Sequence, residues 1–270
     1  MKKTVILTAS LILFTMQIIA QEILDTAYLG CSYRFTLMSD TIEKTKSIKD
    51  ADMRLLTGNK CSKFYSYTTF VRDSFMNSIP NEKEFFLDMM AKNGFDDFRK
   101  QHPLGETYKI YVSHNDQTIL YTDIIMTSRI SYKEPVPKQN WKILNEIKEI
   151  AGYKCQKATC TFRGRDYAAW FTREIPVNEG PWKFNGLPGL IVKVYDTQEH
   201  YDFELYAVNK IKKAVVIEEN NYKNVSINDH IKMRRDVIKN PIPFGKVTDN
   251  EGNIVIVKPL QYDVMERDVK

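Results

Sequence analysis

Large aromatic side chains gather around one short, rigid connection of the chain. Four of them lie on either side of the stretch IPVNEGP at residues 175–181: Trp170, Phe171, Trp182 and Phe184. Two prolines and a glycine restrict the backbone of this stretch, so that it can hold ring faces at the rim of a sheet. Exposed rings of this kind bind peptides, glycans or apolar ligands, whereas buried ones fill a core. We therefore predict a binding role for these four residues, with core packing as the alternative.

The histidines and acids form no catalytic motif along the sequence. Neither His-Glu-x-x-His nor Gly-x-Ser-x-Gly occurs, and the histidines have no partner at a metal-ligand spacing, which favours a surface position for His102, His114, His200 and His230. Asp166, Glu174 and Glu179 could form a carboxylate pair of the glycosidase type, but only the fold can bring them together. The sequence thus predicts no catalytic residue, no cofactor and no metal.

Four cysteines are candidates for disulfide bonds: Cys31, Cys61, Cys155 and Cys160. Thiols pair in oxidising compartments, which an exported chain enters. Cys155 and Cys160 lie in GYKCQKATCTF, which is typical of one strand, and five residue steps put them on opposite faces and roughly 16 Å apart. We expect any bridge to join an early cysteine to a late one, or Cys31 to Cys61.

The first twenty residues are typical of an export signal. Lys2 and Lys3 form a charged start, an apolar run follows at 5–19, and Ala20 precedes the polar Gln21. A transmembrane anchor or a lipoprotein cysteine at the end of YLGC are the alternatives. We expect cleavage near residue 20, a mature chain without a transmembrane anchor, and a location in the periplasm, at the outer membrane or outside the cell.

The charge of the chain argues against a nucleic-acid partner. The formal net charge of the 270 residues is +5, and it falls to +3 when the two lysines of the signal are removed. Basic and acidic residues alternate, as in IKEIAGYK, instead of forming a basic stripe. The partners that we expect are another envelope protein, a peptide or a glycan.

Short, aromatic and β-branched runs predict a mainly β fold. The expected strands lie at 28–38, 62–74, 107–114, 118–125, 157–163, 167–174, 190–196 and 201–211. Short turns such as HNDQ and RGRD separate several of them, which indicates an antiparallel meander. We expect a signal at 1–20, a single antiparallel β domain at 21–240, and a C-terminal hairpin or loose tail at 241–270.

Capping residues predict two helices. Asn81 and Glu84 form a capping box before FFLDMMAKNG, where Asn93-Gly94 is a stop signal. Ser226 can cap a second helix that Pro241 ends. We expect one or two helices packed on the sheet.

The sequence LPGL at residues 187–190 predicts a corner of the main chain that faces the core. Pro188 fixes φ at the second position of a type II turn, and Gly189 accepts the positive φ of the third. Leucines on both sides would point inward. The corner is thus expected to be structural.

The stretch WFTREIPVNEGPWKFNGLPGLIVKVYD at residues 170–196 resembles the signature of the GLPGLI family of exported bacterial proteins. Residues 141–170 also resemble that family, including Gly152-Tyr153-Lys154-Cys155. The resemblance implies a strongly curved antiparallel sheet of bowl or half-barrel shape, and it supplies no catalytic residue. We expect an exported binding or accessory module with a concave sheet; the alternative is a hydrolase acting on protein or glycan, with residues assembled from distant strands.

Overall fold

The computed structural model describes residues 23–40, 45–92, 94–217, 221–240, 247–248, 254–255 and 264–267. The expected export signal at 1–20 lies outside the described residues, as does most of the expected tail at 241–270. Export and cleavage therefore stay predictions. Within the described residues, no helix is both long enough and apolar enough to cross a membrane.

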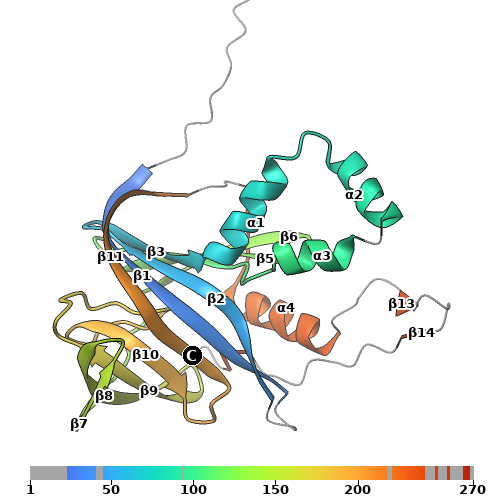
Figure 1. Cartoon of the computed structure of the whole chain (residues 1–270). Helices are drawn as coiled ribbons and strands as arrows, with labels where there is room; N and C mark the ends of the chain where they lie inside the picture. The colour runs from blue at the N-terminus through green and yellow to red at the C-terminus, as the bar shows by residue number, and fades with distance from the viewer. Residues whose placement is uncertain are drawn as a thin grey trace, which may run out of the picture.

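A single twelve-stranded sheet forms the body of the molecule (Figure 1). Its strands lie in the order β12-β6-β5-β4-β3-β2-β1-β11-β10-β9-β8-β7, and only the β12–β6 pair is parallel. The strands are β1 (Ile23–Asp40), β2 (Thr45–Thr57), β3 (Cys61–Ser66), β4 (Lys109–Ser113), β5 (Thr118–Ile125), β6 (Ser128–Pro135), β7 (Lys142–Ile150), β8 (Tyr153–Phe162), β9 (Arg165–Thr172), β10 (Leu190–Asp196), β11 (Tyr201–Val216) and β12 (Lys223–Asn224). The predicted mainly β, antiparallel fold is confirmed.

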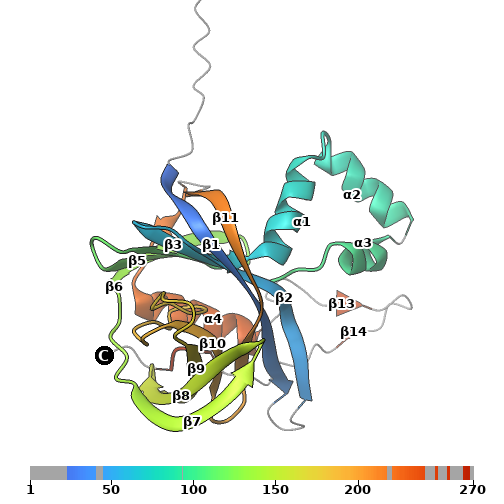
Figure 2. The same ribbon diagram turned by 60° about the vertical axis from the view of Figure 1, so that its left-hand side comes forward.

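Two consecutive meanders, β1 to β6 and β7 to β11, meet where the long strands β1 and β11 pair. Register shifts interrupt that pairing at three places, and bulges of this kind bend a strand and increase its twist. The sheet consequently curls around a hollow, as expected, and Figure 2 shows helix α4 (Ile227–Lys239) within the curve. The concave face carries the main core, in which Phe35 and Phe203 stack with ring centroids 4.3 Å apart.

Four helices accompany the sheet, and both predicted ones are present. Helix α2 (Glu82–Ala91) begins after Asn81, whose side chain accepts a hydrogen bond from the Glu84 amide at 3.2 Å. Helix α4 begins after Ser226, whose hydroxyl accepts from the Asp229 amide at 3.0 Å. The remaining two are α1 (Tyr67–Asn77) and α3 (Phe95–Gln101). Helices α1 to α3 form one insertion between β3 and β4, and this insertion projects from the body of the molecule (Figure 1).

The strand expected at 62–74 is wrong beyond Ser66. Helix α1 begins at Tyr67, directly after Ser66. The side chain of Ser66 caps this helix by accepting a hydrogen bond from the Thr69 amide at 2.9 Å. The run of aromatic and β-branched residues is compatible with a strand or with a helix. The serine cap is the local signal for the helix.

The connection between β9 and β10, residues 173–189, folds back into the hollow of the sheet, and we call it the inner loop. Its corner is buried as predicted, since Leu187 and Leu190 are 1% and 0% exposed. The hydrogen bond, however, runs from the Gly189 amide to the Leu187 carbonyl at 2.8 Å, which is the pattern of a three-residue γ-turn instead of a type II turn. Gly189 has a φ of 144°, and a Cβ there would lie 2.0 Å from the Thr172 carbonyl oxygen, so only glycine fits.

Candidate functional site

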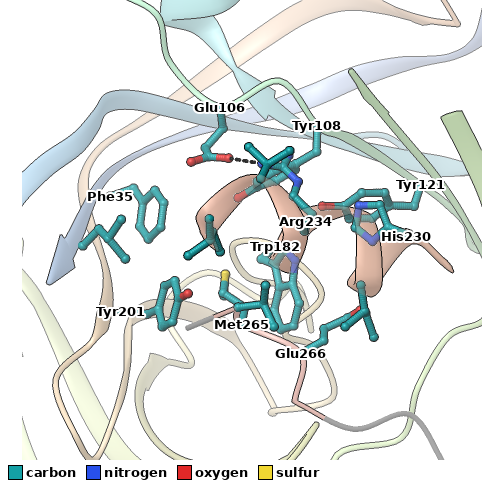
Figure 3. Close-up of a pocket in the computed structure, with 15 residues that line it drawn as sticks. Phe35, Glu106, Tyr108, Tyr121, Trp182, Tyr201, His230, Arg234, Met265 and Glu266 are labelled. Carbon is teal, nitrogen blue, oxygen red and sulfur yellow. Dashed lines mark ion pairs between the residues drawn. The ribbon is translucent and has the colours of Figure 1, made fainter. Parts of the chain in front are cut away.

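A cavity of about 110 Å³ lies in the hollow of the sheet, between the inner loop, helix α4 and residues 264–266 (Figure 3). We call it the central cavity. A water molecule needs roughly 10–15 Å³ of accessible space, so the cavity has room for a small polar ligand or for part of a larger one.

Aromatic rings form much of the wall of the central cavity. Phe35 comes from β1, Tyr121 from β5, Tyr201 from β11 and Trp182 from the inner loop (Figure 3). Tyr108, just before β4, stacks on Tyr121 with ring centroids 5.6 Å apart. Flat aromatic faces beside polar groups suit ligands that have both apolar and hydroxylated surfaces.

A buried carboxylate holds two side chains of helix α4 at the cavity. His230 Nε2 lies 3.0 Å from Oδ2 of Asp123, a residue of β5. Arg234 donates to the same carboxylate twice, from Nε at 2.8 Å and from Nη2 at 2.7 Å. Thr107 Oγ1 donates to Asp123 Oδ1 at 2.8 Å. Because His230 and Arg234 are four residues apart, they lie on one face of the helix and reach one partner together.

Asp123 and Arg234 form the ion pair at the centre of this group. Burial by itself would raise the pKa of Asp123, but the charge of Arg234 and the hydrogen bond from His230 outweigh it and lower that pKa. Desolvation works against the charged form of Arg234, but the carboxylates of Asp123 and Glu106 raise its pKa. Figure 3 shows Glu106 beside Arg234, with Oε2 and Nη1 3.9 Å apart. Both partners of the Asp123–Arg234 pair are therefore charged at neutral pH.

Two buried polar atoms of the cavity residues have no hydrogen-bond partner among the described residues. They are Nδ1 of His230 and the hydroxyl of Tyr108. His230 is 5% exposed and Tyr108 is 4% exposed. In the tautomer that donates from Nε2 to Asp123, Nδ1 of His230 is a hydrogen-bond acceptor. Buried polar groups are seldom left unpaired, so each of these atoms is a candidate to hydrogen-bond a water molecule or a polar group of a ligand.

A second charged group lies beside the rings of Tyr121 and Tyr132, and we call it the lysine cluster. Lys183 of the inner loop is 2% exposed, and its Nζ lies 2.6 Å from Glu134 Oε1 and donates to the Tyr132 hydroxyl at 2.8 Å. Glu266 pairs with the same Nζ, and Arg163 pairs with Glu134. Two cations thus face two carboxylates in an apolar surrounding, where an unpaired charge would be costly.

The four aromatic residues singled out in the sequence are not brought to one place. Trp182 forms part of the wall of the central cavity, and Phe184 borders a smaller cavity of about 30 Å³. Phe171 is fully buried in the main core. Trp170 is half-buried, with its ring 5.7 Å from Lys157 Nζ. A binding role stays a prediction, and Trp182 is the member placed to contact a ligand of the central cavity.

The expected disulfide bonds are absent from the described residues: Cys31, Cys61, Cys155 and Cys160 are all buried free thiols. Desolvation raises the pKa of Cys31 and Cys160 to about 12, and that of Cys61 and Cys155 to about 11. The structure therefore does not support the expected disulfides, and any pairing of these cysteines stays a prediction; thiols with such pKa values are poor nucleophiles at neutral pH.

The acids and histidines named from sequence are distributed differently from the expectation. Asp166 accepts from Thr161 Oγ1 at 2.6 Å, Glu174 accepts from the Lys154 amide at 2.9 Å, and Glu179 lies 2.8 Å from His114, so each of the three acids has a different partner. The surface position expected for His230 is wrong, because this residue is buried against Asp123. Among the described residues there is no group of three or more side chains suited to holding a metal ion.

Comparisons with known proteins now identify the relatives of the chain. A family model described as "N-glycanase peptide, N-terminal domain" matches residues 89–235, which is more than half of the chain. The chain belongs to this family. The expected membership of the GLPGLI family is wrong, because the family that matches residues 141–196 is the N-glycanase one.

Two solved structures of PNGF-II, in space groups P21 and C2, are similar in fold to the chain. Each match has a TM-score of 0.51 and 13% sequence identity. The superposed regions cover 77% and 78% of this chain, and 33% of the PNGF-II chain in both cases. At this identity the likeness concerns the fold alone. The chain spans about a third of the length of PNGF-II, and a comparison with curated proteins gives no match.

Proposed function

We propose that the chain is a glycan-related module and that its central cavity binds a saccharide unit of a glycan or glycopeptide. The observation that carries the proposal is that His230 and Tyr108, which line a cavity walled by aromatic rings, each have a buried polar atom with no partner among the described residues. Sugars carry many hydroxyl groups on a ring with apolar faces, so they can satisfy both kinds of surface. The family takes its name from an N-glycanase, which makes glycans the ligand class to test first.

Titration of the full chain with N,N′-diacetylchitobiose tests this proposal, with the fluorescence of Trp182 as one readout. We expect saturable binding that Tyr108→Phe weakens about three- to tenfold, the effect of losing one hydrogen bond. The substitution should leave the free energy of unfolding unchanged or slightly higher, because the hydroxyl has no protein partner among the described residues. Tyr28→Phe is the matched control, since Tyr28 is 44% exposed and does not line the cavity. Equal binding by the two variants would refute the proposed site.

Hydrolysis of a glycan is the second candidate function, and the Asp123–His230 contact favours it. A carboxylate that orients one imidazole nitrogen and leaves the other free is the arrangement of a general base. In this role His230 Nδ1 would take a proton from a water molecule that attacks the substrate. Mass spectrometry of a glycopeptide incubated with the chain would detect a released glycan, and His230→Gln should abolish the release. Binding without release would leave the binding module as the function.

Location outside the cytoplasm belongs to the same proposal, and the sequence at residues 1–20 supports it. Mass analysis of the mature N-terminus from the native organism tests it. We expect a chain that begins near Gln21. An intact Met1 on cytoplasmic protein would contradict it.

A further inference from the structure

Residues 264–267 lie on the body of the molecule as a bound peptide would. The Val264 carbonyl accepts hydrogen bonds from Arg165 Nε at 3.3 Å and Nη2 at 3.0 Å, and the Met265 carbonyl accepts from the Tyr167 hydroxyl at 3.5 Å. At the other end, the Arg267 carbonyl accepts from Arg235 Nη2 at 2.8 Å. Three of the four carbonyls of this segment are thus held by side chains from β9 and α4.

The segment also inserts two side chains into the body. Val264 packs with Ile231 and Ile238 of helix α4 in a small apolar cluster. Glu266 enters the lysine cluster, where it pairs with Lys183 and lies 3.8 Å from Arg163 Nε. The segment therefore has an apolar anchor at Val264, an acidic anchor two residues later at Glu266, and backbone carbonyls that side chains of the body bind.

We propose that these contacts define a peptide-binding groove, formed by Arg163, Arg165, Tyr167, Lys183 and Arg235, that the chain fills with its own residues 264–267. The ligand class is a peptide with an apolar residue followed, two positions later, by glutamate. This inference does not rest on the saccharide proposal, although Val264, Met265 and Glu266 also border the central cavity. Release of the segment would open that side of the cavity.

Charge balance explains why the groove should prefer an acidic peptide. With Glu266 in place, the cations of Lys183 and Arg163 face the carboxylates of Glu266 and Glu134. Without Glu266, the two cations of Lys183 and Arg163 would share the single carboxylate of Glu134. One positive charge would then be uncompensated at a site where Lys183 is only 2% exposed. A buried unpaired charge is strongly unfavourable, so another carboxylate is the replacement that restores the balance.

Binding of the chain's own tail sequence in trans tests the groove. Fluorescein-labelled peptides YDVMERDVK, which is residues 262–270, and YDVMQRDVK are titrated with full-length Glu266→Gln protein and with the wild type, and fluorescence anisotropy is measured. We expect the glutamate peptide to bind Glu266→Gln protein about tenfold more tightly than the glutamine peptide does. We also expect the glutamate peptide to bind the wild-type protein about tenfold more weakly than it binds Glu266→Gln protein. In the wild type, residues 264–267 with Glu266 compete for the groove.

Glu146→Gln is the matched control, because Glu146 is an exposed acid on β7 that pairs with Lys157, outside the groove. It should bind the glutamate peptide as the wild type does. If circular dichroism shows that Glu266→Gln does not fold, the wild type is titrated to high peptide concentration, and the glutamate preference is expected there too. Equal affinity for the two peptides on folded protein overturns the proposal, whatever the outcome of the chitobiose titration.

Discussion

Asp123 and His230 come from different elements, a strand and a helix 107 positions apart, and meet with Oδ2 and Nε2 at 3.0 Å. The carboxylate orients the imidazole and simultaneously holds Arg234. This one residue therefore joins helix α4 to the sheet and orders the side chains of the central cavity.

Replacement of Asp123 by asparagine should lower the free energy of unfolding by about 3 kcal/mol at neutral pH, because it leaves the charge of Arg234 without its main partner. The lowered pKa of Asp123 means that its carboxylate stabilises the fold above the unfolded value near 3.8 and stops doing so as pH falls through the folded value. Urea denaturation at pH 7 and at acid pH measures the gap, which is the difference in the free energy of unfolding between the wild type and Asp123→Asn. Asp97→Asn, in an exposed pair with Lys100, is the control and should change little. A gap that persists unchanged at acid pH would contradict the charge argument.

Gly189→Ala should destabilise the chain by at least 2 kcal/mol more than Gly152→Ala. Both glycines have positive φ, at 144° and 81°, but a Cβ on Gly189 would lie 2.0 Å from the Thr172 oxygen, whereas a Cβ on Gly152 meets nothing within 4 Å. A side chain at positive φ costs roughly 1–3 kcal/mol at either position, and only Gly189 adds the clash with the Thr172 oxygen. Urea midpoints of the two variants give the measurement. Similar midpoints would show that the inner-loop corner is not tightly packed.

The four cysteines should be unreactive in the folded protein. Desolvation raises the pKa values to about 11 or 12, so the reactive thiolate is almost absent at pH 8. With Ellman's reagent we expect negligible reaction until urea unfolds the chain and four thiols thereafter. Fewer than four thiols in the unfolded protein would instead indicate a disulfide bond.

His114 should stabilise the fold more at mildly acidic pH than at alkaline pH. Its hydrogen bond with Glu179 of the inner loop, at 2.8 Å, raises the pKa of His114 above its usual value. Its contribution, roughly 1 kcal/mol, is therefore complete below the unfolded value near 6.5 and is lost as pH rises through the higher folded value. Urea denaturation of the wild type and His114→Gln at pH 6 and pH 9 tests this. A stability gap that does not shrink at pH 9 would argue against it.

Local features of the fold could be predicted from the sequence because their causes are local. Asn81 and Ser226 cap helices within three residues of themselves, and the alternation of apolar residues predicts strands such as β10. Helix α1 was missed because its aromatic residues also suit a strand, and only the cap at Ser66 distinguishes the two.

The candidate site could not be predicted in the same way. Lys183 meets Glu266, and Asp123 meets Arg234, across 83 and 111 positions of the chain, and no spacing in the sequence encodes such contacts. One local signal was available: His230 and Arg234 share a helix face with the apolar Ile231 and Ile238, which indicates a buried polar pair. The short glycine-proline stretch at 184–190 instead favoured a family that the comparisons contradict.

A crystal structure of the chain with N,N′-diacetylchitobiose is the most direct test of the central claim, that the central cavity binds saccharide. The account predicts a sugar ring against Trp182, with one hydroxyl or amide group within hydrogen-bond distance of His230 Nδ1 and another near the Tyr108 hydroxyl. A sugar bound elsewhere on the molecule, with the central cavity unchanged, would contradict it.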